Sequence, residues 1–308
     1  MLNKITILIL VLLCSLNAHA ELPEQLTIAF QKLKDPAKLH TEAQKVAQSL
    51  EQIFKRKIKT QIPTDYGASV QALVSGTADI AYLDSLSFLL ARRDGGAKVL
   101  LAEQRIDTTG KLRTDYDSVF VVRKDSPYQN LEQALKDKAT LTVAFTSPTS
   151  TSGYVFPYRR LVKESVLQPG GDPAKIFKKV QFGGSYVQTV EQVLNKRADI
   201  CAVSYYVVEG DSSKKYLSDQ QLGELRILER NPGVPTHVIA IRKGFSLKDQ
   251  IKLKAGLLKL TKKMPELLTD VYGTATFIDV DEEKHLQASI EAVEYIGLPI
   301  EDLKKKKG

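Results

Sequence analysis

The sequence predicts an α/β protein built as two similar lobes joined by two crossover strands. Three observations support this class. Short apolar strands alternate with longer amphipathic segments, a gapless internal repeat occurs once in each half, and a second, shorter repeat marks the places where the chain passes between the halves. Two lobes joined in this way form a hinge, and ligands of such proteins bind in the cleft between the lobes.

The first 20 residues have the pattern of a secretory signal peptide. One cation, Lys4, precedes an apolar run over residues 5–16, and Ala18-His19-Ala20 offers small residues for cleavage after Ala20. The apolar run is too short to span a bilayer. Cys14 lacks the small residues that precede a lipidated cysteine, so a lipoprotein is the less favoured alternative. We expect an exported, periplasmic protein.

The charge of the chain argues against nucleic acid as a partner. The net charge is +8, and loss of Lys4 with the signal peptide reduces it to +7. The cations form short runs without interleaved aromatic residues, for example Lys55-Arg56-Lys57 and the tail 304–307, and such runs are typical of solvated surfaces.

The mature chain contains one cysteine, Cys201, which excludes an intramolecular disulfide. Packing must therefore supply the stability, and a chain of this length can bury a sizeable core. Cys201 follows Ala198-Asp199-Ile200 in an apolar run, so we interpret it as a small core residue. The alternative is a site in which the thiol binds a soft ligand such as arsenite.

The alternating pattern gives the elements of the first lobe in order. Apolar runs bounded by polar residues predict strands, and amphipathic stretches predict helices. We expect strands over residues 26–30, 58–62, 79–83 and 99–102, and helices over residues 41–54, 69–75 and 85–92.

The second half opens on a Ser/Thr-rich loop. An apolar strand over residues 141–145 precedes it, and a helix is expected over residues 154–166. Six of the seven residues from Thr146 to Ser152 are Ser or Thr. The start of a helix has unpaired N–H groups and partial positive charge, so these residues predict a cradle for an oxyanion. The alternative is an ordinary loop, because Ser, Thr and Pro also favour turns.

The internal repeat aligns residues 66–81 with residues 186–201 without gaps. Both copies consist of a tyrosine, a helix, a turn, and Ala-Asp-Ile at the start of a buried strand. Asp79 and Asp199 are equivalent in the two copies, so we expect structural turn roles for them and no catalytic carboxylate pair.

The second repeat pairs residues 119–124 with residues 238–243, each an apolar strand that ends in two cations. We expect the chain to leave the first lobe near Phe120 and to return near Ile239. The predicted organisation is a signal peptide (1–20), the first part of lobe one (21–120), lobe two (121–239), and a return to lobe one (240–308). The helices expected over residues 247–260 and 286–295 would pack on lobe one, followed by the basic tail.

Four groups of residues stand in a characteristic order along the chain. They are Tyr66-Gly67 before Gly76 and Asp79, Tyr116 before a strand and Lys124-Asp125-Ser126-Pro127, Ser150-Thr151-Ser152-Gly153 with Pro157, and Gly183-Gly184-Ser185. Together these motifs resemble the phosphonate, phosphite and phosphate-binding periplasmic proteins of ABC transporters. The resemblance implies a class II periplasmic-binding-protein fold that captures its ligand without cofactor or chemistry.

In that family, the resemblance implies, a Ser-Thr-Ser run at a helix start holds the oxyanion and tyrosines from both sides close over it. Ser150, Thr151 and Ser152 would then bind the oxyanion, and Tyr66 and Tyr116 would donate hydrogen bonds to it. Without the family, both tyrosines are equally well read as half-buried core residues.

Three positions depart from the family pattern. Tyr186 stands where the family often has His, Asp84-Ser85 replaces a Gly-Pro pair, and Pro235-Thr236-His237 replaces an acid or amide before the returning strand. Asp84 is a candidate partner for a cationic amine on the ligand. Protonated His237 would attract a second negative charge, and otherwise it is a loop histidine.

The expected function is that of a monomeric solute receptor that delivers a small phosphorus oxyanion to an ABC permease in the inner membrane. A metal site is not expected, because the histidines lack ligand-like spacing. An enzyme is not expected either, because the common nucleophile, zinc, phosphate-loop and dinucleotide motifs are missing from the sequence. Two alternatives remain: an oxyanion sensor partnered with a membrane histidine kinase, and, more remotely, a secreted hydrolase that uses the Ser-rich loop.

Overall fold

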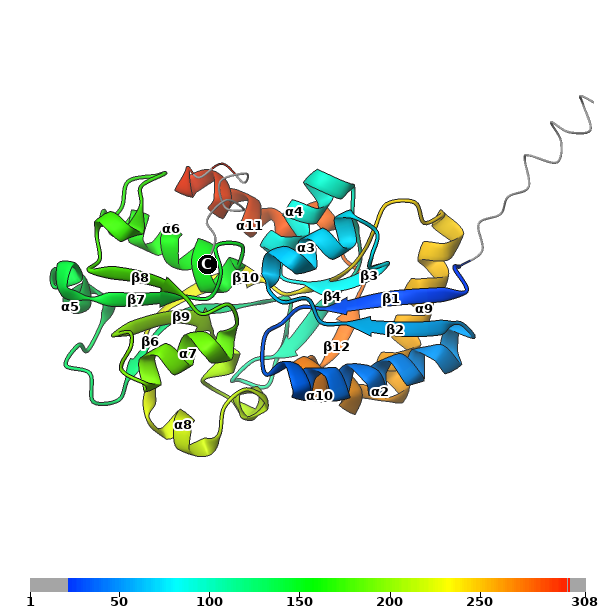
Figure 1. Ribbon diagram of the computed structural model, residues 1–308, viewed down its shortest axis with the longest axis horizontal. Helices are drawn as coiled ribbons and strands as arrows, with labels where there is room; N and C mark the ends of the chain where they lie inside the picture. Colours follow the sequence, from blue (N-terminus) through cyan, green and yellow to red (C-terminus); the bar gives the residue numbers. More distant parts are fainter. Residues whose placement is uncertain (1–21, 298, 300–308) are drawn as a thin grey trace, which may run out of the picture.

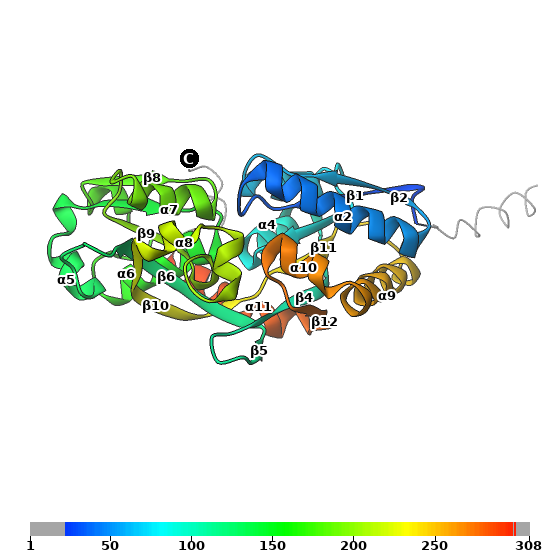
Figure 2. The same cartoon turned by 90° about the horizontal axis from the view of Figure 1, so that it is seen from below.

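The computed structural model describes residues 22–297 and residue 299 and shows two α/β lobes side by side (Figures 1 and 2). The predicted signal peptide and the basic tail lie outside the described residues. Each lobe contains one mixed sheet with helices against it, so the predicted two-lobed α/β class is confirmed. Within the described part of the chain, none of the helices combines the length and the apolar character needed to cross a membrane.

The first lobe is built on a seven-stranded sheet with the order β12-β4-β11-β3-β1-β2, in which β5 pairs with β4 at one edge. β1 lies parallel to β2 and β3, whereas β11 lies antiparallel to β3 and β4. The strands are β1 (Gln25–Phe30), β2 (Lys57–Gln61), β3 (Ile80–Leu83), β4 (Lys98–Ile106), β5 (Leu112–Arg113), β11 (Val238–Ile241) and β12 (Thr276–Ile278).

The second lobe is built on a five-stranded sheet with the order β10-β6-β9-β7-β8. β7 lies parallel to β8 and β9, and β6 lies antiparallel to β9 and β10. The strands are β6 (Asp115–Arg123), β7 (Thr142–Phe145), β8 (Lys179–Phe182), β9 (Ile200–Ser204) and β10 (Leu225–Pro235).

The two sheets repeat one topology, as the internal sequence repeat suggests. The path β2-β1-β3-β11-β4 in the first lobe corresponds to β8-β7-β9-β6-β10 in the second. The repeated aspartates have the same structural role: Asp79 accepts a hydrogen bond from the Thr27 amide at 2.8 Å, and Asp199 accepts one from the Thr142 amide at 2.7 Å. Each carboxylate ties the start of its strand to the neighbouring parallel strand.

Short polar side chains start most of the helices by accepting backbone N–H groups that lack intrahelical partners. Asp65, Asp84 and Ser185 cap α3, α4 and α7 in this way. The helices are α2 (Pro36–Phe54), α3 (Tyr66–Val74), α4 (Ser85–Gly95), α5 (Leu131–Lys136), α6 (Phe156–Lys163), α7 (Tyr186–Leu194), α8 (Asp219–Gly223), α9 (Leu247–Lys263), α10 (Pro265–Tyr272) and α11 (Glu282–Ile296).

The chain passes between the sheets earlier than expected. It leaves the first sheet after β5 and enters the second with β6, and it returns at residues 236–237, between β10 and β11. Phe120, predicted as the first passage, lies inside β6, and Ile239 lies inside β11. The similar strands over residues 119–123 and 238–241 therefore belong to different sheets, and the passages precede them.

Two further expectations need correction. The helix predicted over residues 154–166 starts as one turn of π-helix, η2 (Thr151–Val155), and α6 ends at Lys163. The last predicted helix, α11, does not pack on lobe one alone. It contacts β10, α6 and η2 of the second lobe as well as α4 of the first, and thus bridges the lobes (Figure 1). α9 packs on the first lobe as expected, against α2, β4 and β12.

Candidate ligand-binding site

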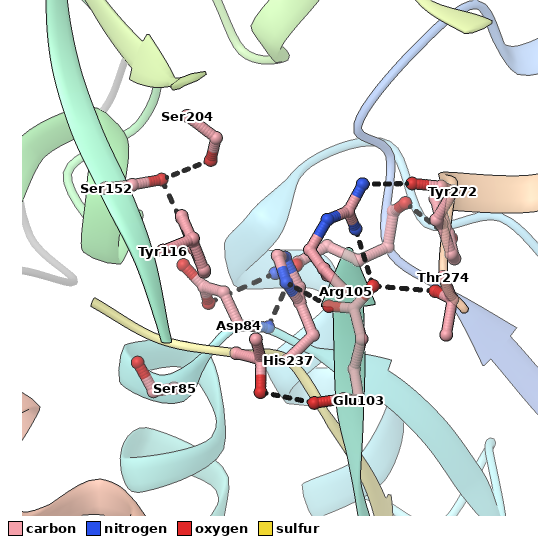
Figure 3. Close-up of polar contacts among 12 residues, drawn as sticks. Asp84, Ser85, Glu103, Arg105, Tyr116, Ser152, Ser204, His237, Tyr272 and Thr274 are labelled. Atoms are coloured by element: carbon pink, nitrogen blue, oxygen red, sulfur yellow. Dashed lines mark hydrogen bonds and ion pairs between the residues drawn. The ribbon is translucent and has the colours of Figure 1, made fainter. Parts of the chain in front are cut away.

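The Ser-rich loop follows β7 and faces the first lobe at the start of α4 (Figure 3). Ser150 begins η2 as its N-cap: its hydroxyl accepts the Gly153 amide at 3.1 Å. The Gly153 carbonyl in turn accepts the Thr146 amide at 3.0 Å, which folds the loop back on the strand end. The Ser150 hydroxyl is therefore committed to the loop itself, whereas Thr151 and Ser152 turn toward other elements.

Ser152 is the centre of a cluster of buried hydroxyl groups. Its Oγ lies 2.7 Å from Ser204 Oγ, 2.9 Å from the Tyr186 hydroxyl and 3.4 Å from the Tyr116 hydroxyl. Tyr116 stands on β6, Tyr186 begins α7, and Ser204 ends β9, so three different elements of the second lobe converge on one serine. Figure 3 shows the contacts of Ser152 with Tyr116 and Ser204. All of these side chains are buried. The cluster offers several neutral hydrogen-bond donors within a small space.

Two further tyrosines complete this cluster. Tyr66, from the first lobe, packs its ring edge-on against Tyr186 with the ring centroids 6.3 Å apart, and Tyr206 packs edge-on against Tyr186 at 6.1 Å. The hydroxyls of Tyr66 and Tyr206 are buried, and neither has a hydrogen-bond partner among the residues that the structure describes. Burial raises the pKa of the Tyr66, Tyr116, Tyr186 and Tyr206 hydroxyls, so all four stay protonated and can donate hydrogen bonds; Tyr116 donates to Ser152 here.

Thr151 contacts the first lobe through Asp84. The Asp84 Oδ2 atom accepts the Thr151 amide at 2.7 Å and the Thr151 hydroxyl at 3.0 Å. Thr151 Oγ1 in turn accepts the Leu86 amide at 2.8 Å and the Ser85 hydroxyl at 3.1 Å. The Asp84 carboxylate therefore contacts the Ser-rich loop and takes two of its donors.

The other oxygen of Asp84 belongs to the first lobe. Its Oδ1 atom accepts the Ser87 amide at 3.0 Å as the N-cap of α4, and Gln31 Nε2 lies 3.5 Å away. One carboxylate thus caps the starts of α4 and η2 together. Both helix starts carry partial positive charge, which stabilises the buried anion.

His237 lies in the passage between β10 and β11 within a stack of aromatic rings. It stacks on Tyr82 at 4.9 Å with an interplanar angle of 9°, and on Tyr116 at 6.0 Å. Tyr82 also stacks on Tyr272 at 4.2 Å. His237 is fully buried, and its Nδ1 atom lies 3.3 Å from Glu103 Oε2. The structure therefore places His237 between the Ser152 cluster and a buried carboxylate.

That carboxylate belongs to an ion pair on β4. Glu103 Oε1 lies 2.5 Å from Arg105 Nη1 and accepts the Thr274 hydroxyl at 2.6 Å. Arg105 also donates to the Tyr272 carbonyl at 2.7 Å and lies over the Tyr206 ring, 3.6 Å from its centroid. Burial by itself raises the pKa of Glu103, but Arg105, His237 and Thr274 together lower it to about 2. Glu103 is therefore ionised at neutral pH.

The structure brings the predicted residues to one region and adds several that the sequence patterns did not single out: Tyr82, Glu103, Arg105, Ser204 and Tyr206. One of these residues, Ser204, could have been found from the sequence. Continued three residues beyond the aligned ranges, the repeat that pairs Tyr66 with Tyr186 also pairs Asp84 with Ser204. Asp84 directly follows β3, and Ser204 ends the equivalent strand β9. Glu103 and Arg105 alternate along a strand that had no recognisable motif. In the residues that the structure describes, no group of three or more His, Cys, Asp or Glu side chains is arranged to hold a metal ion.

Comparisons with known proteins place these features in a family. The family described as ABC transporter, phosphonate, periplasmic substrate-binding protein matches residues 28–285. The chain is 27% identical over 238 residues to the phosphonates-binding periplasmic protein of Escherichia coli, covering 76% of this chain and 66% of that one. It is 27% identical over 150 residues to the phosphate-import protein PhnD of Mycolicibacterium smegmatis, covering 49% of this chain and 45% of that one. The matches thus span slightly less than two thirds of the length of the Escherichia coli relative and less than half of the length of the Mycolicibacterium smegmatis relative.

A solved structure shows the same fold. PhnD1 from Prochlorococcus marinus, determined in complex with methylphosphonate, superposes with a TM-score of 0.74 at 21% identity, covering 89% of this chain and 98% of that one. The likeness confirms the predicted two-lobed periplasmic-binding-protein fold.

Proposed function

The chain belongs to the family of periplasmic substrate-binding proteins of ABC phosphonate transporters, and we propose that it is the solute receptor of such an importer for a small phosphorus oxyanion. The observation that carries the proposal is the Ser152 cluster, in which buried neutral donors of the second lobe converge on one serine beside a helix start. Tyr66 of the first lobe packs against this cluster. The names of the two relatives, which refer to phosphonates and to phosphate, support a phosphorus ligand.

The proposed mechanism is capture without chemistry. The oxyanion docks at Thr151 and Ser152 while the lobes are apart, and closure brings Tyr66 from the first lobe to Tyr116 and Tyr186 on the second. The hydroxyl and N–H donors then replace the hydration shell of the ligand, so a ligand that leaves donors unpaired is strongly disfavoured. The closed, monomeric receptor in the periplasm would present both lobes to the inner-membrane permease.

The surroundings of Ser152 favour a receptor over a hydrolase. Within the described chain, the hydrogen-bond partners of Ser152 Oγ are the hydroxyls of Tyr116, Tyr186 and Ser204, whereas a serine nucleophile needs a general base in that place. Burial raises the pKa of the Tyr186 hydroxyl, so it is a poor base near neutral pH. We therefore propose that the chain is not an enzyme.

Calorimetric titration of the mature, ligand-stripped protein tests this function. We expect binding of at least one of phosphite, phosphate, methylphosphonate and 2-aminoethylphosphonate. Ser152→Ala removes a donor to a charged ligand and should weaken that binding by about tenfold or more, corresponding to about 1.5 kcal/mol. Ser75→Ala is the matched control, because Ser75 is exposed at the end of α3 and donates to the Gln71 carbonyl.

Two results would contradict the proposal. One is the failure of all four ligands to bind to folded protein. The other is equal affinity of the Ser152→Ala and Ser75→Ala variants for the same ligand.

A further inference from the structure

The chain carries its own anion at the place where an oxyanion is expected. Asp84 is fully buried, and its Oδ2 atom accepts both the amide and the hydroxyl of Thr151. These are the donors that the Ser-Thr-Ser cradle would offer to a ligand oxygen. Asp84 comes from the first lobe and Thr151 from the second, so the contact exists only while the lobes are together.

A ligand anion and Asp84 cannot use these donors at the same time. The amide and the hydroxyl of Thr151 have one hydrogen each, and both already point to one carboxylate oxygen. An oxyanion that binds at Thr151 must therefore displace Asp84, and an oxyanion at Ser152 alone lies beside it. The hydrogen-bond partners of the Asp84 carboxylate are neutral groups of Gln31, Ser87 and Thr151, so its negative charge acts on any neighbouring anion.

We propose that Asp84 competes with the ligand for the donors of Thr151, so that the Asp84 carboxylate holds the lobes closed in place of the oxyanion. Its charge then makes the site prefer singly charged phosphorus anions over doubly charged ones. The identity of the ligand in this proposal rests on the proposed function. Closure of the lobes without ligand rests on the Asp84–Thr151 contact alone. Repulsion between like charges grows with the charge of the ligand and is strong where water is excluded. A dianion is therefore penalised more than a monoanion of similar size.

Asp84→Asn isolates this role. Asparagine is as good an N-cap as aspartate, so its side-chain oxygen can keep the Ser87 amide and preserve α4. Its NH₂ group would then face the donors of Thr151, so the variant loses both the interlobe contact and the charge. Asp35→Asn is the matched control: Asp35 is an exposed N-cap of α2 in the same lobe and accepts the Lys38 amide at 2.9 Å.

The first measurement compares phosphite with hypophosphite by calorimetry, above the second pKa of phosphite, where phosphite carries two charges and hypophosphite one. In Asp84→Asn we expect the affinity for phosphite to rise at least about tenfold and the affinity for hypophosphite to rise less. Asp35→Asn should leave both affinities at the wild-type level. Equal gains for both anions, no gain, or weaker binding in Asp84→Asn would overturn the proposal, and weaker binding would make Asp84 a partner of the ligand.

The second measurement needs no ligand. Small-angle X-ray scattering of the stripped proteins should give a larger radius of gyration for Asp84→Asn than for the wild type and for Asp35→Asn, because the contact that holds the lobes together is lost. An unchanged radius would refute closure by Asp84. If neither protein binds any phosphorus anion, the proposed function fails, and the scattering comparison alone decides whether Asp84 closes the lobes.

Discussion

Individual residues at the site differ in chemistry although the two lobes share a topology. Tyr66 and Tyr186 occupy equivalent positions of the repeat, and their rings meet across the lobes. Asp84 and Ser204 are another equivalent pair, but they differ in chemistry: the first lobe contributes a carboxylate and the second a hydroxyl. A hydroxyl can donate to an anion, but a carboxylate accepts only. The asymmetry between Asp84 and Ser204 therefore decides which charge the site accepts.

The reactivity of the Cys201 thiol is set by its buried surroundings. It lies on β9, fully buried, and burial raises the pKa of its thiol, which disfavours the reactive thiolate. We expect a thiol reagent such as dithionitrobenzoate to leave Cys201 unmodified in the native protein and to modify it once urea unfolds the chain. Rapid modification of the native protein, slowed by arsenite, would instead support the soft-ligand alternative.

At the scale of elements, the start of η2 depends on close packing of the loop onto β7. Gly153 lies against the Thr146 side chain, and a Cβ atom at position 153 would overlap Thr146 and approach Ser150 Oγ to 2.9 Å. The π-turn is therefore possible because residue 153 lacks a side chain. The same packing turns Thr151 toward Asp84 and Ser152 toward the tyrosines.

Gly153→Ala tests this packing. We expect the free energy of unfolding to fall by about 1–3 kcal/mol, because the loop must shift to admit the methyl group. Gly223→Ala in α8 is the control: among the described residues, the added methyl carbon would contact nothing beyond its own helix backbone and chain neighbours within 4 Å, and alanine favours a helix, so stability should stay the same or rise. Urea unfolding of both variants provides the measurement. Equal stability of the two variants would mean that the loop relaxes freely around position 153.

At the scale of the whole molecule, a buried ion pair joins the elements next to the passages between the lobes. Glu103 and Arg105 lie on β4. Thr274 and the Tyr272 carbonyl, from the C-terminal part of the chain, bind this pair. His237 from the returning passage lies beside Glu103, and Tyr206 from the second lobe lies under Arg105. These groups hold the first lobe, the return of the chain and the second lobe in one polar network.

Glu103→Gln should destabilise the protein by about 3 kcal/mol, because Arg105 would remain buried without its counter-charge. Glu209→Gln is the control, since Glu209 pairs with Arg230 near the surface and should cost about 1 kcal/mol or less. The free energy of unfolding, measured in urea for both variants, distinguishes the two cases. Similar losses would show that the buried pair adds nothing beyond a surface pair.

The same pair predicts an acid-sensitive stability. The pKa of Glu103 is lowered from 4.5 to about 2 in the folded protein, so the unfolded chain binds the proton more readily. Its contribution is complete above the unfolded pKa and is lost as the pH falls from about 4.5 toward about 2. The stability of Glu103→Gln should therefore depend less on pH across this window than that of the wild type. Parallel pH profiles would contradict this assignment.

Much of the fold could be predicted from the sequence because its causes are local. The apolar alternation located most strands of the first lobe, the gapless repeat anticipated the shared topology of the two sheets, and the Ser/Thr-rich loop marked the helix start at the site. The residue pattern pointed to the loop that contains Ser152, and the family resemblance added Tyr66 and Tyr116. Elements without a strong pattern, such as β5, β8, β10 and β12, were not predicted.

Only the tertiary structure decided how these residues use one another. Asp84 and Thr151 are 67 residues apart, and no local pattern shows that one carboxylate caps two helix starts in different lobes. Likewise, α11 lies across both lobes, and the chain passes between the lobes before β6 and before β11. Both features depend on which surfaces remain to be covered once the two sheets have formed. Periodicity reports the face that a segment buries, whereas the partner that buries it is set by contacts between distant parts of the chain.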